Sequence, residues 1–566
     1  MLLGPIFSFD LVTSARRRRY YLLRALYAFV LAALIWTIFS DHGAGTQVSI
    51  HEAAALAESF FTAMSVVQLL AVLMLGPALA AGTVALERER RTIEYLFVTD
   101  LSNSEIVLGK LASRLLHLGF LVAVGLPVMA LAMLFGGISP EQLATLFAVT
   151  LSTMVAVIAL SVAVSVWSAR ARDAVVRSYL AVFALVALPP CLANLWRELM
   201  GYSSVSQAVP WILQQLWEAN PFYVFELLQT AGTWPSVLKI VSCHLAFAGV
   251  CAALALGAVR RVHLNEMGRA PKTARRRRWR GELGDRPMLW KELFADQARL
   301  RLGILGRLVI GTIAAGYFLL AVSFAWSPTD GGMRPWQLEE FAAWTTALLS
   351  LGLILIAARA ASSITSEKDR QCWEPLLLTS LTPSEIIGGK IWGNLYAARG
   401  LALLVSFAWL LQLVSYPDYL IVIPFDLATL GVLMLFCSSL GVLFSLYSRD
   451  SLRAIATTLA VGIVVGGGYI FCCVLVLIPS GGPGRGSEII FAACMPFLLV
   501  FPTIVYAESH QQYSTTEVGL TAAYVIGMIG YAVASLLIWL SCVQSLAQTA
   551  QGVPELASRA GSPRRN

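Results

Sequence analysis

Long apolar runs recur along the chain, and short polar loops separate each run from the next. A membrane-spanning helix needs roughly 20 mostly apolar residues. Backbone groups in lipid must be satisfied within the segment, which favours helices, and the alternating strands of about ten residues typical of a barrel are absent. The pattern predicts an all-α polytopic membrane protein with twelve transmembrane helices. The predicted spans are residues 20–40, 60–86, 111–136, 142–167, 175–196, 236–258, 307–326, 341–365, 391–415, 424–446, 454–478 and 518–543.

Two other apolar stretches are interrupted and fall at comparable places in the two halves of the chain. Residues 205–230 contain Pro221, residues 489–506 contain Pro496, and a phenylalanine follows each proline. A thirteenth span at 489–506 would break the agreement between the halves. We therefore predict that both stretches are re-entrant or interfacial segments on the outer face, between the last two spans of each half.

The agreement between the halves extends to a sequence repeat. Glu87–Lys110 (ERERRTIEYLFVTDLSNSEIVLGK) and Glu367–Lys390 (EKDRQCWEPLLLTSLTPSEIIGGK) are identical at eleven of 24 positions, without a gap. Ordinary composition would give roughly one or two identities by chance. We predict two parallel six-helix repeats, related by an axis along the membrane normal. The predicted parts are a first unit at 1–258, a basic linker at 259–286, a second unit at 287–546 and a cytoplasmic tail at 547–566.

Each repeat contains a helix start with its own cap. Ser102 is a favoured N-cap residue and Glu105 follows three positions later, which is the pattern of a capping box. The second copy repeats it with Thr382 and Glu385, and adds Pro383 at the first helical position, where proline is favoured. The third span of each half should therefore begin at a fixed place.

The segment before the first span of each half also matches. Gly4-Pro5-Ile6-Phe7 and Arg286-Pro287-Met288-Leu289-Trp290 each lead to an acidic residue followed by leucine, and each precedes a basic stretch. An apolar segment next to basic residues suits a helix that lies in the cytoplasmic membrane interface. We therefore predict an interfacial N-terminal helix for each unit.

Composition and charge fit a chain surrounded by lipid. The sequence is 58% hydrophobic and only 13% charged, whereas soluble domains carry about 25% charged residues. Lys and Arg gather in the loops that face one side, which predicts a multi-pass protein of the cell (inner or cytoplasmic) membrane with both termini cytoplasmic. The net charge is +8 and the linker contains Arg275–Arg278; contact with anionic lipid explains both, and no nucleic acid is expected. The nine cysteines have no metal-site spacing.

The repeated pattern E-[RK]-[ED]-x-x-x-x-E-x-L-x-x-T-x-L-[ST]-x-x-E-I-x-x-G-K resembles the permease (transmembrane) subunits of type 2 ATP-binding-cassette (ABC) exporters. The resemblance implies six spans per unit, an interfacial N-terminal helix, a coupling helix after the second span and a re-entrant outer segment. It also implies that two separate ABC ATPase subunits hold the ATP and Mg, so that this chain binds no cofactor. The residues implied to contact those subunits are Glu87, Arg90, Glu94, Leu96, Glu105, Glu367, Arg370, Glu374, Leu376 and Glu385.

The sequence contains no G-x-x-x-x-G-K-[ST] motif for ATP phosphates. Two alternatives remain beside the permease. A secondary transporter with two six-span halves would need intramembrane ionisable residues, which are sparse; Arg399, about 13 Å past Lys390 along a helix, is the best candidate for an intramembrane polar site. A membrane enzyme would need a catalytic constellation, which we do not find. The transported substrate is not predicted.

Overall fold

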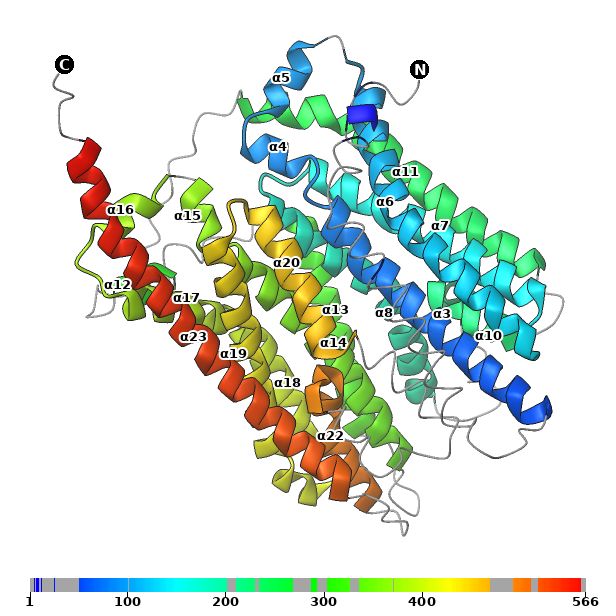
Figure 1. The fold of residues 1–566 in the computed structure, drawn as a ribbon. Coiled ribbons are helices and arrows are strands. Elements are labelled where there is room, and N and C mark those ends of the chain that lie inside the picture. The colour runs from blue at the N-terminus through cyan, green and yellow to red at the C-terminus, as the bar shows by residue number, and fades with distance from the viewer. Residues whose placement is uncertain are drawn as a thin grey trace. The chain divides into compact units, whose positions relative to one another are not determined.

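The chain is all-α, as predicted. A computed structural model of the 566 residues describes 50–99, 101–200, 210–229, 234–267, 287–292, 303–325, 335–369, 371–468, 492–509 and 518–560, together with isolated positions before residue 50. All elements in these residues are helical (Figure 1). They include nine helices long and apolar enough to cross a membrane, or ten if one bent pair is a single span. The protein is therefore a multi-pass membrane protein.

The structure divides into two compact units, of which the first is mainly Met1–Lys272. At its centre lies α7 (Pro140–Val166), which packs against α3, α6, α8 and α11. Many of its apolar side chains are buried in the core of the unit, and Ile158 and Val162 have no exposed area. The other helices of this unit are α3 (Ile50–Ala80), α4 (Ala85–Glu89), α5 (Ile93–Val98), α6 (Asn103–Ala132), η1 (Met133–Phe135), α8 (Ala171–Met200), α9 (Trp211–Glu218), η2 (Pro221–Tyr223), α10 (Val224–Gln229) and α11 (Trp234–Met267).

The second unit is mainly Tyr317–Gly466 with Glu488–Asn566. Its central helix is α19 (Ile423–Tyr447), which packs against α14, α17, α20, α22 and α23. The other helices from residue 287 onward are α12 (Pro287–Trp290), α13 (Gly303–Ala325), α14 (Pro335–Ala361), α15 (Thr365–Asp369), α16 (Trp373–Leu377), α17 (Pro383–Ala397), α18 (Arg399–Gln412), η4 (Pro417–Ile421), α20 (Ser451–Ile463), η5 (Val464–Gly468), α22 (Met495–Ser509) and α23 (Val518–Ala560).

Most of the predicted spans coincide with helices of spanning length. The predicted span 20–40 and the end of the predicted span 454–478 lie outside the described residues. The predicted span 391–415 is not one straight helix, because α17 and α18 meet at an angle of 48°. The break is at Ala398, whose N–H bonds to the Leu395 carbonyl at 3.0 Å, a tightened turn that interrupts the helical ladder.

Neither of the two interrupted apolar stretches forms a helix of spanning length. The first contains the short helices α9, η2 and α10, and the second contains α22, which has 15 residues. The side chain of Asn220 accepts a hydrogen bond from the Phe222 N–H at 3.0 Å and so caps η2. The placement of these stretches on the outer face remains a prediction.

Candidate functional site

In each unit a long helix is separated from the short helix that follows it, α3 from α4 and α14 from α15, and a serine of the central helix binds the backbone at this break. Two backbone N–H groups, those of residues 84 and 85, donate to Ser165 Oγ on α7 at 3.1 and 3.0 Å. In the second unit the N–H groups of residues 364 and 365 donate to Ser445 Oγ on α19 at 2.9 and 3.0 Å. The first N–H groups of a helix need such partners because they have none inside it. The break is thus built twice, 280 residues apart.

A basic side chain next to each break donates hydrogen bonds to carbonyl groups at the end of the same central helix. The guanidinium of Arg88 donates to the Val166 carbonyl at 3.1 Å. The ammonium of Lys368 donates to the Leu446 carbonyl and, at 3.2 Å, to the Ser448 carbonyl. The last carbonyls of a helix lack intrahelical partners and carry its partial negative charge, so a cation there is stabilising. These contacts also recur at an interval of 280 residues.

The next turn has the same backbone in both units. Arg91 and Gln371 have φ angles of 58° and 59°, in the left-handed region, which costs a residue with a Cβ roughly 1–2 kcal/mol. The following N–H groups, of Thr92 and Cys372, each reach back 2.9 Å to the carbonyl five residues earlier. This is the bond pattern of a helix ended by a left-handed residue. It redirects the chain from α4 into α5, and from α15 into α16.

In each unit a lysine near the start of a long helix, α6 or α17, pairs with a glutamate of the preceding short helix, α4 or α15. Lys110 contacts Glu87 at 2.5 Å, and Lys390 contacts Glu367 at 3.1 Å. The lysine side chains are 6% and 0% exposed. Each pair ties the short helix after the break, α4 or α15, to the longer helix that begins within the repeat, α6 or α17.

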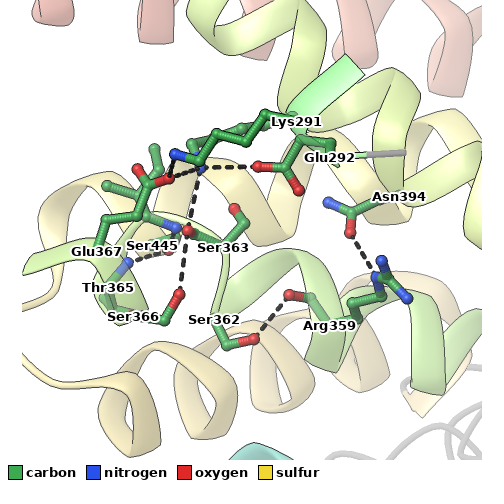
Figure 2. A network of polar contacts seen from close by, with 12 residues as sticks. Lys291, Glu292, Arg359, Ser362, Ser363, Thr365, Ser366, Glu367, Asn394 and Ser445 are labelled. Carbon is green, nitrogen blue, oxygen red and sulfur yellow. Dashed lines mark hydrogen bonds and ion pairs between the residues drawn. The ribbon is translucent and has the colours of Figure 1, made fainter. Parts of the chain in front are cut away.

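The pair in the second unit belongs to a larger cluster (Figure 2). Glu292, just after the short helix α12, lies 3.2 Å from the Lys390 ammonium, which also donates to the Ser363 carbonyl at 3.1 Å. Lys291 adds a second contact to Glu367 at 2.6 Å. Glycine permits this approach: a Cβ on Gly393 would lie 2.5 Å from Glu292 Cβ. The cluster therefore joins α12, α15 and α17 at one buried point.

Both predicted capping boxes are confirmed. The Glu105 N–H donates to Ser102 Oγ at 3.3 Å, and the Ser102 N–H donates to the Glu105 carboxylate at 2.9 Å. Thr382 and Glu385 make the same two bonds at the same two distances. Pro383 occupies the first turn of α17, as predicted. Both glutamates are therefore engaged by the start of their own helix.

The last spanning helix of each unit contacts the same region. Arg260 of α11 donates to the Leu101 carbonyl at 2.9 Å, and its guanidinium lies 5.7 Å from the centroid of the Phe97 ring. In the second unit Cys542 of α23 belongs to a buried cluster with Trp373 and Ile386. The repeated segment of each unit is thus packed against several helices, including the last long helix of that unit.

The predicted partner-contacting residues divide into inward and outward groups. Glu87 and Glu367 point to lysines, and Glu105 and Glu385 are in the capping boxes, as described above. Leu96 and Leu376 are half-buried, whereas the acids Glu94 and Glu374 and the cation Arg90 are exposed. Arg370 lies outside the described residues. Whether any of them contacts a partner remains a prediction.

Exposed apolar side chains flank these acids, and sequence reasoning missed them. Tyr95, Val98 and Leu378 are 76%, 87% and 68% exposed. The half of the repeat that faces solvent is therefore a mixed apolar and acidic surface on α5 and α16. Their sequence signal was weak because only Leu96 and Leu376, among the apolar positions nearby, are identical in both copies.

Arg399 lies at the bend between α17 and α18. It is exposed, and its guanidinium lies 3.9 Å from the centroid of the Tyr396 ring, at cation–π distance. Its role as an intramembrane polar site remains a prediction. Sequence reasoning overlooked a different ionisable residue, Asp426, which is 2% exposed on α19. The signal was available, because Asp426 is the only charged residue in the predicted span 424–446.

Part of the chain matches a known protein family. Residues 5–260 match the family model described as "ABC-2 family transporter protein". No curated protein matches the chain. Among the described residues, no three His, Cys, Asp or Glu side chains gather as a metal site would require.

Proposed function

This chain belongs, through its residues 5–260, to the ABC-2 transporter family, and we propose that it supplies both permease units of an ABC exporter. As a member of that family it is a transmembrane component of an ABC transporter. The second unit lies beyond the matched residues, but it contains the same break, turn, lysine pair and capping box 280 residues later. That recurrence is the observation that carries the proposal, because it gives one chain two matching coupling elements, α4 with α5 and α15 with α16.

We further propose that a separate ABC ATPase, with one subunit for each coupling element, binds the surfaces on α5 and α16. The sequence has no phosphate-binding motif of its own. Each unit offers its own outward surface: exposed Tyr95 and Val98 lie beside Glu94 in the first, and exposed Leu378 lies near Glu374 in the second. An apolar centre with a polar rim is the usual anatomy of a protein–protein interface. The two elements would then lie on the cytoplasmic side of the inner membrane, with both termini on that side.

The contacts behind each surface link it to the spanning helices, so that movement of a bound ATPase would displace those helices. The lysine pairs join the short helices to α6 and α17, and the serine contacts join them to α7 and α19. These contacts hold α4 and α15, and the helices that follow them are packed as well, because Ile93 of α5 and Trp373 of α16 belong to buried clusters of their units. A displacement of α5 or α16 therefore moves packed spanning helices rather than bending a free loop. Rigid-body movement of such helices is a common route to alternating access.

The test is co-purification with the ATPase after charge reversal on the exposed acids. Glu94→Lys together with Glu374→Lys should reduce the recovered ATPase by at least about tenfold, which corresponds to the loss of about 1.4 kcal/mol of binding free energy. Glu339→Lys is the matched control. Glu339 is an exposed acid near the start of α14, whereas α15 and α16 follow the end of that helix. Unchanged assembly and unchanged stimulation of ATP hydrolysis in the double variant would refute the docking surface.

The same preparation separates this proposal from a secondary transporter. Substrate movement in vesicles that contain both components should require hydrolysable ATP and should stop with a non-hydrolysable analogue. Transport by the chain alone, driven by an ion gradient, would favour the secondary transporter instead.

A further inference from the structure

Asp426 lies at the end of α19 remote from the coupling element. It is 19 residues from Ser445, or about 28 Å along the helix at ~1.5 Å per residue. One of its carboxyl oxygens, Oδ2, accepts a hydrogen bond from the Tyr419 hydroxyl of η4 at 2.9 Å. The same oxygen lies 3.5 Å from Thr503 Oγ1 of α22, and the two hydroxyls are 2.9 Å apart. Three elements thus meet at one carboxyl group.

The second carboxyl oxygen, Oδ1, is buried and has no hydrogen-bond partner among the described residues. Within the same residues, none of the ion pairs includes Asp426. A carboxylate buried without a cation is very costly, and such groups usually take up a proton instead. An ionisable side chain inside a membrane segment is also expected to have a functional role.

The first unit has no counterpart to this acid. The residue 280 positions earlier is Leu146, which is fully buried in the apolar core on α7. A leucine fills this position in one unit, so the helix can pack without a polar group there. Packing alone therefore gives no reason for the carboxyl group in the second unit.

We propose that Asp426, Tyr419 and Thr503 form a proton-binding site that makes the packing of α22 against α19 depend on proton uptake. While the helices are packed, the proton is bound to the Asp426 carboxyl group, which is then neutral. When α22 moves away, water reaches the carboxyl group, its O–H bond breaks and the proton passes to water. Repacking takes one proton up again. The inference goes beyond the proposed function, because it concerns the end of the unit remote from the coupling element.

Among the described residues, the groups that surround the carboxyl group are hydroxyls rather than cations. The titratable groups that face it are Tyr419 from η4, Tyr317 from α13 and Tyr524 from α23. Tyr506 of α22 packs edge-on against Tyr419, with ring centroids 5.4 Å apart. Tyrosine ordinarily loses its proton near pH 10. Asp418 on η4 and Glu339 and Glu340 on α14 are acids on neighbouring elements, and all three are exposed. Asp426 is therefore the group expected to respond first as pH rises.

A native cysteine reports on the packing of α22. Cys494 immediately precedes this helix, is 6% exposed, and accepts a hydrogen bond from the Phe497 N–H at 3.4 Å. Cys542 on α23 is a second buried thiol, 1% exposed, and serves as an internal reference. Both cysteines are labelled by a thiol reagent in lipid nanodiscs, and mass spectrometry of their peptides measures the labelling rate of each. In the ratio of the Cys494 rate to the Cys542 rate, the general increase of thiol reactivity with pH cancels.

The Cys494/Cys542 ratio should rise with pH by up to about tenfold per pH unit, because opening is linked to the release of one proton. Asp426→Asn mimics the protonated acid, so its ratio should stay low and independent of pH. Asp418→Asn, the matched control on η4, should behave as the unaltered protein does.

Two results would overturn the proposal. One is a ratio in the unaltered protein that does not change with pH. The other is a ratio that follows the sodium concentration at constant pH, which would make the ligand an alkali cation. Neither result bears on ATPase docking, so the two proposals fail separately. The measurement on the unaltered protein remains decisive even if Asp426→Asn does not fold.

Discussion

Several charged side chains of this chain are buried inside the protein, where an unpaired charge is costly. Lys390 has no exposed side-chain area, and two carboxylates, those of Glu292 and Glu367, lie within ion-pair distance of it. Lys110 pairs with Glu87, whose side chain is 28% exposed. Water can hydrate Glu87 after the loss of its partner, whereas the two carboxylates around Lys390 would remain buried. The two units should therefore tolerate the loss of their lysines differently.

The first prediction concerns that difference. Lys390→Met should lower the free energy of unfolding by about 3–5 kcal/mol, the usual cost of leaving a buried charge without its partner; here Glu292 loses its cation, while Glu367 keeps Lys291. Lys110→Met should cost less. Thermal unfolding in detergent measures both, with Glu374→Gln on the exposed surface as the control. Neutralising the acids as well, with Glu292→Gln and Glu367→Gln, should recover most of the loss; a triple variant no more stable than Lys390→Met would contradict this account.

The helices show which features local sequence can predict. The capping boxes were predictable because donor and acceptor are three residues apart, as in Ser102 and Glu105. The breaks in the second spans were not, because the serine that accepts their N–H groups lies about 80 residues away, as in Ser165. The bend at Ala398 was not predictable either, since no proline is present there. Sequence pattern located the spans, while tertiary contacts decided where they break.

A second prediction concerns the cap of α17. Thr382→Ala should destabilise the start of this helix by about 1 kcal/mol, because the Glu385 N–H loses its acceptor. Hydrogen exchange of the backbone amides of Ser384, Glu385 and Ile386 should accelerate about fivefold. Thr457→Ala, which removes a hydroxyl from an exposed position in α20, serves as the control. Equal exchange in both variants would mean that tertiary packing alone holds the helix start.

A third prediction concerns the contact between α14 and α19. A Cβ on Gly441 would lie 2.5 Å from Ala360 Cβ and 2.8 Å from the Ala357 carbonyl oxygen, whereas Gly431 has no atom within 4 Å of that position. Gly441→Val should therefore cost about 1–3 kcal/mol through overpacking. Gly431→Val should change thermal stability much less. Similar losses for both would show that the effect is one of helix propensity rather than of close approach.

At the scale of the whole molecule, the duplication organises the candidate site. Sequence identity predicted the repeat, but it could not show which repeated residues turn inward. Glu87 and Glu367 were grouped with Glu94 and Glu374 because all four are identical within their pairs. Only the fold distinguishes acids that meet a buried lysine from acids that remain exposed. The outward apolar residues, such as Val98, were missed for the complementary reason that they differ between the copies.

A fourth prediction tests the parallel arrangement of the repeats. A cysteine at exposed Val98 and the native exposed Cys372 should react with an impermeant thiol reagent in inside-out vesicles. Neither should react in intact cells, because both coupling elements are expected on the cytoplasmic side. Cysteine introduced at Glu339 should show the reverse pattern. Reaction of Val98→Cys and Cys372 from opposite sides would mean that the units have opposite orientations.

The contrast between Asp426 and Leu146 has a genetic consequence. In a transporter assembled from two identical chains, every substitution appears on both sides of the assembly at once. Here a single codon change alters one unit and leaves its sister untouched. An acid can therefore arise by mutation in one unit without any change in the other, and Asp426 can be replaced in the laboratory while Leu146 is left unchanged.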